Sequence, residues 1–127
     1  MQPGSSVPIL LMLCSATVGA QGLPTEFPAD AVPISSDSLK TNVLGKKFVG
    51  KRADGRVLTM EFGADGQYRI TAADGGMLDG KVRVDADKLC QDMRKPLESS
   101  CNDVRLKENL LFYKRNVNGE VVTYAAQ

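Results

Sequence analysis

Five turn dipeptides divide the chain from residue 46 onward into short segments. They are Asp54-Gly55, Asp65-Gly66, Asp74-Gly75, Asp79-Gly80 and Asn118-Gly119. Asp-Gly and Asn-Gly supply the positive φ angles of tight hairpin turns, and the segments between them alternate apolar and polar side chains. This combination predicts strands joined by hairpins, without crossover helices.

Eight strands follow from this punctuation. We expect them at residues 46–52, 56–63, 67–72, 77–84, 88–92, 101–106, 109–115 and 120–125. Each strand has one apolar and one polar face, which describes an antiparallel sheet with one wet side. The predicted fold class is therefore all-β, a small antiparallel up-and-down barrel or curled meander of about eight strands. A two-sheet β-sandwich is the alternative.

The apolar faces of these strands supply a candidate barrel interior. Its members are Leu58, Met60, Phe62, Tyr68 and Ile70, followed by Val82, Val84, Leu89, Val104, Leu106 and Phe112. These side chains suffice to fill a narrow eight-stranded barrel, which is either solid or holds one small ligand. The sequence leaves both alternatives open.

The residues before the strands follow a different pattern. Gln21 to Asp37 contains three prolines and no regular period, so we expect a flexible or extended leader that joins neither a ladder nor the core. Ser36 or Asp37 then caps a short helix over residues 38–44, which Gly45 ends. The domain that remains is a single β-barrel over residues 38–127.

The first twenty residues carry no charged side chain. They hold an apolar run from Val7 to Cys14, followed by small residues up to Ala20. This order is typical of a secretory signal peptide cleaved after Ala20. The run is shorter than the roughly 20 residues that span a bilayer, so we expect no integral membrane protein. A lipoprotein signal that uses Cys14 is disfavoured, because bulky Leu13 stands where a small side chain is needed.

Two cysteines remain after such a cleavage, Cys90 and Cys101. An even pair in an exported protein predicts a disulfide, and the alternative is two free thiols. The bond would close a loop of about a dozen residues and contribute on the order of 2 to 3 kcal/mol. Arg94, Lys95 and Glu98 lie within this loop and form a candidate binding loop, because anchored surface loops often carry recognition. The predicted location is periplasmic or secreted.

A basic stretch lies at the start of the domain. Its members are Lys46, Lys47, Lys51, Arg52 and Arg56. If they share one rim of the barrel, they form a binding rim for an anionic partner, and otherwise they are an ordinary solvated surface. The whole chain has 16 basic and 15 acidic side chains, a net charge of +1, so its charge does not indicate a nucleic acid partner.

The chain contains no histidine. Ser-His-Asp and Cys-His machinery and His-ligated metal sites therefore lack their usual base or ligand. Asp85 and Asp87 are the best local candidates for calcium, but turn chemistry explains the aspartates that precede glycines in separate turns. We predict no catalytic residue, no metal and no cofactor, and thus a protein that is not an enzyme.

Several of these motifs are similar to those of a known family. They are residues 39–50, Asp65-Gly66-Gln67, Gly80-Lys81-Val82, Asp87-Lys88-Leu89-Cys90, Cys101 and Asn118-Gly119. Together they resemble small exported lipocalin-like (calycin-like) β-barrel proteins of proteobacteria, many of unknown function. This chain has Lys81 or Val82 where that group often has Trp. The resemblance implies a periplasmic calycin-like barrel and no catalytic residue.

Two functions agree with these observations. The first is a noncatalytic periplasmic or secreted binding module that recognises a protein or cell-envelope component through its loops and basic rim, with enzyme inhibition as a specific version. The second is a carrier that holds a small apolar ligand in the barrel interior. A solid interior would favour the first function, and an open cavity would favour the second.

Overall fold

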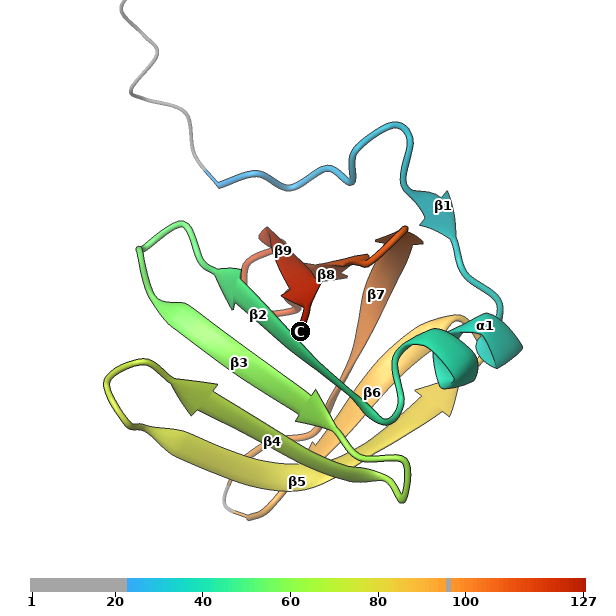
Figure 1. Ribbon diagram of the computed structural model, residues 1–127. Helices are drawn as coiled ribbons and strands as arrows, with labels where there is room; N and C mark the ends of the chain where they lie inside the picture. Colours follow the sequence, from blue (N-terminus) through green and yellow to red (C-terminus); the bar gives the residue numbers. More distant parts are fainter. Residues whose placement is uncertain (1–22, 96) are drawn as a thin grey trace, which may run out of the picture.

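The computed structural model describes residues 23–95 and 97–127, and the predicted signal peptide lies outside these ranges. Figure 1 shows the helix and strands that they form. In chain order these are β1 (Val32–Pro33), α1 (Ser36–Asn42), β2 (Lys46–Lys51), β3 (Val57–Phe62), β4 (Gln67–Ala72), β5 (Met77–Asp85), β6 (Lys88–Met93), β7 (Ser100–Lys107), β8 (Leu110–Lys114) and β9 (Val121–Ala126). No helix in the described ranges is long and apolar enough to cross a membrane.

Strands β2 to β9 close into an antiparallel barrel. Each strand pairs with the next along the chain, and β9 returns to β2, where Phe48 lies opposite Ala126. This closure confirms the up-and-down barrel and rules out the β-sandwich.

The eight predicted strands agree with β2 to β9 to within one residue at every end. Four of the five dipeptides lie in hairpin turns, but the turn predicted at Asp79-Gly80 is wrong, because Gly80 lies inside β5 and pairs with Tyr68 and Met93. A Cβ atom at Gly80 would lie 2.6 Å from the backbone oxygen of Asp92, so the glycine serves close packing there.

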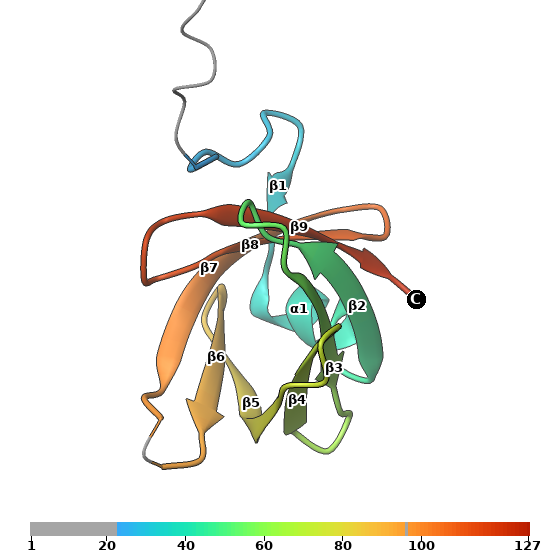
Figure 2. The same cartoon turned by 90° about the vertical axis from the view of Figure 1, so that its left-hand side faces the viewer.

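The inner face of the barrel is packed at the end that α1 covers. Leu39 and Val43, from α1 and its C-terminal cap, are fully buried in the same core cluster as the inward side chains of the strands. That cluster contains the predicted Leu58, Met60, Phe62, Tyr68, Val82, Leu89 and Val104, with Ile70, Val84 and Leu106 partly buried against it. Figure 2 looks along the barrel and shows α1 behind the strands, at the far end.

The helix begins earlier than the sequence predicts. Ser35 is the N-cap, and its hydroxyl accepts a hydrogen bond from the backbone N–H of Ser38 at 3.1 Å. Ser36 and Asp37, the predicted caps, lie instead in the first turn, where the carboxylate of Asp37 complements the helix dipole. The helix also ends earlier than predicted, at Asn42, with Val43 as its C-cap. Gly45, the predicted end, lies two residues beyond this cap with a φ of +82°.

The described part of the leader joins both the sheet and the core, so the expectation of a free leader is wrong there. Val32 and Pro33 of β1 pair with Leu106 and Arg105 of β7, and Ile34 is only 6% exposed within the main core. The physical reason is that β6 leaves part of one edge of β7 without a partner strand. The β6–β7 ladder ends where Lys88 meets Asp103, and β1 takes up the edge of β7 that continues beyond it.

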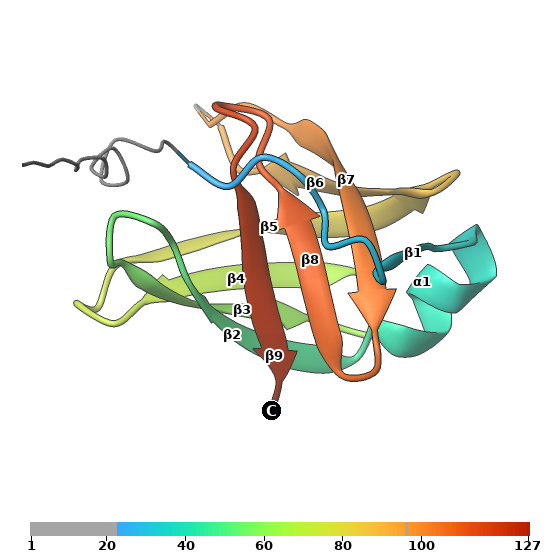
Figure 3. The same ribbon diagram turned by 90° about the horizontal axis from the view of Figure 1, so that it is seen from above.

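The leader also covers the outer face of the barrel. Phe27 and Ala31 pack there against Phe112 and Val121 in a second, smaller apolar cluster, and Figure 3 shows this segment crossing over β8. Phe112 therefore points out of the barrel, contrary to the prediction that it fills the interior. The folded unit begins before residue 38, because these leader residues shield apolar surface that water would otherwise contact.

Cys90 and Cys101 form the predicted disulfide. They are direct partners in the β6–β7 ladder and lie on the outer face of the barrel, next to the partner pair Gln91 and Ser100. The bond therefore fixes the ladder beside the loop that joins these strands. A disulfide is compatible with an oxidising compartment.

Candidate functional site

The end of the barrel opposite α1 opens into a cavity of about 530 Å³, here called the mouth cavity. Its walls combine inward side chains of the strands with the ends of the β6–β7 and β8–β9 loops. The lining residues are Arg52, Met60, Tyr68, Ile70, Leu78, Gln91, Met93, Glu98, Ser99, Ser100, Asn102, Tyr113, Arg115, Asn116, Val117 and Tyr124. The barrel is thus filled at one end and open at the other.

Strand alternation explains why polar residues reach this cavity. In β2, Phe48 and Gly50 are buried on the inner face, and Arg52 follows at the next step of two. In β6 the same series runs through Leu89 and Gln91. These polar side chains therefore face inward, where the apolar core gives way to the open mouth.

A hydrogen-bonded network lines one wall of the mouth cavity. The backbone N–H of Asn116 donates to Oδ1 of Asn102 at 3.3 Å, and Nδ2 of Asn102 donates to Oε1 of Gln91 at 2.8 Å and to Oγ of Ser100 at 3.1 Å. The hydroxyl of Tyr113 also donates to Oε1 of Gln91, at 2.9 Å. Nε2 of Gln91 is buried and has no hydrogen-bond partner among the described residues.

The two arginines of the mouth cavity differ in their partners. Nη1 of Arg115 lies 3.0 Å from Oε1 of Glu120, whose carboxylate is almost fully buried and also accepts the backbone N–H of Ala53 at 2.7 Å. Nε of Arg52 is buried without a hydrogen-bond partner in the described ranges. The charge of Arg115 is therefore compensated within the protein, and no described carboxylate compensates Arg52 in the same way.

Three phenols line the mouth cavity and stay protonated at neutral pH. Burial raises the pKa of Tyr68, Tyr113 and Tyr124 above the ordinary value for tyrosine. The positive charge of Arg52 acts in the opposite direction on the pKa of all three. Together these groups present hydroxyl and guanidinium donors beside apolar surface.

The predicted basic rim is not assembled. Lys46 and Lys47 begin β2 near α1, whereas Lys51 ends β2 at the mouth, and a six-residue strand separates them by about 16 Å. Arg56 is at the mouth but pairs with Asp74 at 3.9 Å, and Lys47 pairs with Glu61 at 3.8 Å. Arg52 alone of the five turns into the mouth cavity.

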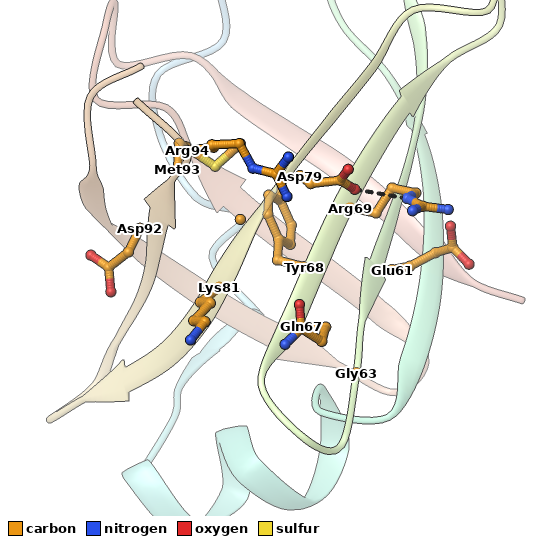
Figure 4. A pocket seen from close by; sticks show the side chains of 11 residues that line it. Glu61, Gly63, Gln67, Tyr68, Arg69, Asp79, Lys81, Asp92, Met93 and Arg94 are labelled. Carbon is orange, nitrogen blue, oxygen red and sulfur yellow. Dashed lines mark hydrogen bonds and ion pairs between the residues drawn. The ribbon is translucent and has the colours of Figure 1, made fainter. Parts of the chain in front are cut away.

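The predicted binding loop is divided between two hollows. Glu98 lines the mouth cavity, Arg94 lines a second hollow of about 540 Å³ across β3 to β6, and Lys95 is exposed. Figure 4 shows Arg94 extending over this second hollow toward Asp79. The loop therefore forms part of one wall of each hollow, and its three charges do not converge on one point.

The acidic side chains of the second hollow are paired, whereas Lys81 and Arg94 form no ion pair with a described residue. Arg69 and Asp79 form an ion pair at 2.8 Å, drawn in Figure 4, and Asp92 is held by Arg83 at 2.8 Å. Acidic and basic side chains occur there in equal number, three of each: Glu61, Asp79 and Asp92, with Arg69, Lys81 and Arg94. The charged side chains on β3 to β5 alternate with the inward residues and so lie on the outer face, whereas the mouth cavity enters the barrel and is the better candidate site.

Sequence reasoning placed Tyr68, Met60 and Ile70 in the interior but missed the polar half of the site. The sequence did contain the signal, because every second residue of a strand faces inward. The inward series that includes Gly50 continues to Arg52, and the one that includes Leu89 continues to Gln91. Among residues 23–95 and 97–127, no three Cys, Asp or Glu side chains gather to hold a metal ion.

The fold and the site define a class, a closed up-and-down β-barrel with a polar, open mouth. No protein family model, curated protein or solved structure matches this chain. The closed barrel is consistent with the fold that the lipocalin-like resemblance implies.

Proposed function

We propose that the protein is a noncatalytic binding module of an oxidising compartment, periplasmic or extracellular, that holds a small molecule in the mouth cavity. The observation that carries this proposal is the cavity itself, about 530 Å³ at the open end of a barrel whose other end α1 closes. This volume falls within the roughly 300 to 1,000 Å³ typical of ligand pockets. The disulfide and the resemblance to exported barrels support the compartment.

The geometry favours this function over recognition through a basic rim. Lys46 and Lys47 lie at the α1 end of β2 and Arg56 is paired with Asp74, so the five charges do not gather on one rim. Within the barrel, the packed half near α1 leaves the mouth as the place for a ligand. Its lining mixes Met60 and Ile70 with tyrosine hydroxyls and an arginine, which suits a ligand with both apolar and polar parts.

A protein partner at the same end is the second candidate, supported by one observation. Four exposed apolar side chains surround the mouth: Met77, Leu78, Leu97 and Val117, with exposed fractions of 42 to 76%. Clustered exposed apolar residues mark interaction sites on many proteins. A partner that presses on these side chains would make the protein a binding module or an inhibitor through its mouth loops.

The neutral fluorescent probe 1-N-phenylnaphthylamine tests the cavity. We expect saturable binding by the wild-type protein. Ile70→Trp should abolish it, because the indole would occupy the cavity that Ile70 lines. Thr71→Trp is the matched control, since Thr71 is the next residue of β4 and faces outward, and it should bind as the wild type does. Equal probe binding by the two folded variants would overturn the proposal.

Native mass spectrometry of protein from its own compartment separates the two candidates. A small adduct that Ile70→Trp removes supports the ligand. A complex with a second chain that Met77→Asp dissociates, while probe binding stays intact, supports the partner. Met77 suits this purpose because it is 53% exposed at the mouth and does not line the cavity.

A further inference from the structure

Two buried N–H donors of the mouth cavity have no acceptor in the described ranges, Nε of Arg52 and Nε2 of Gln91. Both residues line the cavity, and Gln91 is only 3% exposed. Folded proteins pair the great majority of their buried polar groups, since a buried donor without a partner is destabilising. Because both unpaired groups are donors, the missing partner is an acceptor.

The orientation of the Gln91 amide is fixed by a chain of hydrogen bonds that starts at the backbone. A backbone N–H can only donate, so Asn116 requires the side-chain oxygen of Asn102 to face it. The amide nitrogen of Asn102 then faces Gln91 and requires its oxygen. If the Gln91 amide were flipped, two donors would face each other. The amide of Gln91 is therefore fixed with Oε1 toward Asn102 and Tyr113, and Nε2 remains as a donor without a partner in the lining of the cavity.

The charged residues of the mouth cavity favour a ligand with a single negative charge. Three charged residues line the cavity, Arg52, Arg115 and Glu98. Buried Glu120 neutralises Arg115, and Glu98 is exposed on the rim. The interior therefore keeps one uncompensated positive charge, that of Arg52. A planar carboxylate matches it, because its oxygens accept hydrogen bonds from a guanidinium and from an amide together.

The rim indicates what is attached to this carboxylate. Leu78 and Val117 line the cavity yet are 47% and 76% exposed. An apolar body that leaves the mouth past them would cover both side chains and remove their surface from water. A ligand with its charged group at Arg52 and an apolar part at the rim fits both halves of the lining.

We propose that the mouth cavity binds the carboxylate of a singly charged amphipathic small molecule, with Arg52 and Gln91 as its donors. This inference rests on the proposed function and names the ligand class of the same cavity. The nearest matched probes are 4-phenylbutyrate and its neutral amide, 4-phenylbutyramide. They share one shape and differ in charge and in one acceptor.

The test measures displacement of 1-N-phenylnaphthylamine by each probe at pH 7. We expect the carboxylate to bind at least about tenfold more tightly than the amide, since a hydrogen bond to a charged group is worth more than a neutral one. Arg52→Gln should remove this preference. Arg56→Gln, which makes the same charge change on the same hairpin outside the cavity, should keep it.

Gln91→Glu gives the sharper result. The variant keeps one oxygen to accept from Asn102 and Tyr113 but replaces the donor Nε2 with a second oxygen. We expect this variant to bind 4-phenylbutyramide more tightly than 4-phenylbutyrate. Unfolding would weaken the binding of both probes and so could not produce this reversal. If this variant does not fold, Arg52→Gln still decides the matter, because Arg52 is only half-buried.

The outcomes separate this inference from the proposed function. Equal affinity of the wild type for the two probes would overturn the carboxylate site and leave the cavity function standing. A carboxylate preference that survives both Arg52→Gln and Gln91→Glu would overturn the assignment of the donors. Failure of the neutral fluorescent probe itself to bind would overturn the proposed function and this inference together.

Discussion

The ring of Tyr124 occupies the space above Gly50, its direct partner across the β2–β9 ladder. A Cβ atom on Gly50 would lie 2.5 Å from Cδ1 of Tyr124 and 2.6 Å from the backbone oxygen of Thr123. Tyr124 is 2% exposed and meets Tyr113 edge-on, with ring centroids 6.2 Å apart. The absence of a side chain at Gly50 thus lets two phenols pack together at the base of the mouth.

Gly50→Ala should therefore lower the free energy of unfolding. Overpacking a filled site typically costs about 1 to 3 kcal/mol, and the contact with backbone at Thr123 leaves little room to relax. Gly76→Ala is the control, because a Cβ there would meet nothing closer than 3.4 Å. Urea denaturation should show a change within about 0.5 kcal/mol for the control. Equal midpoints for the two variants would contradict the close contact.

The leader should stabilise the barrel through Ile34. Ile34→Ala removes a side chain that is 6% exposed in the main core and should cost at least about 2 kcal/mol of unfolding free energy. Val32→Ala, two residues earlier and 59% exposed, should change it by less than about 0.5 kcal/mol. Thermal and urea unfolding measure both, and an unchanged stability of Ile34→Ala would show that the leader does not pack.

Alkaline titration should reveal no free phenol in the folded protein. All three tyrosines of the chain line the mouth cavity, and burial raises the pKa of each. The folded form then binds its phenolic protons more tightly than the unfolded form. This contribution to stability is complete below the ordinary tyrosine pKa of about 10 and is lost as pH rises above it.

Absorbance at 295 nm, followed together with circular dichroism, checks this expectation. Phenolate should form only as the strand signal disappears. A phenolate signal with a midpoint near pH 10 and an intact strand signal would show that the tyrosines face solvent.

The disulfide should stabilise the barrel without being required for its shape. Replacing Cys90 and Cys101 together with Ala should lower the free energy of unfolding by about 2 to 3 kcal/mol, as expected for a bridge that closes a loop of this length. The strand signal in circular dichroism should persist at low temperature. Adding a reductant to the wild type should give the same urea midpoint as the double variant, and no shift in either case would contradict the stabilising role.

The strands could be predicted from sequence because their information is local. Four of the five Asp-Gly and Asn-Gly dipeptides mark a reversal, and alternation between the turns sets the faces. The packing of the leader could not be predicted in this way, because a two-residue strand has no detectable period. Its contact with Phe112 also depends on which edge of β7 the barrel leaves open. Composition drew attention to its prolines, although Pro33 is tolerated in an outermost strand.

The candidate site was harder to foresee, because four hairpin ends contribute to it. Arg52 belonged to a basic run that suggested an outer surface, whereas its place in the inward series of β2 decides its direction. Gln91 carried no motif at all. Its role depends on Asn102 and on the backbone of Asn116, which lies 25 residues further along the chain, and only the folded barrel brings the three together.

The pairing of Phe48 with Ala126 has a kinetic consequence. Every other ladder of the barrel joins strands that are neighbours in sequence, whereas this seam joins the first barrel strand to the last. Closing so long a loop costs more conformational entropy than closing a hairpin, so the seam should form late in folding. Arg52 follows one side of the seam and Tyr124 lies on the other. The mouth cavity needs residues from both sides of this seam, so it does not exist in the half-open sheet. We therefore expect the ability to bind a ligand to appear only when the barrel closes.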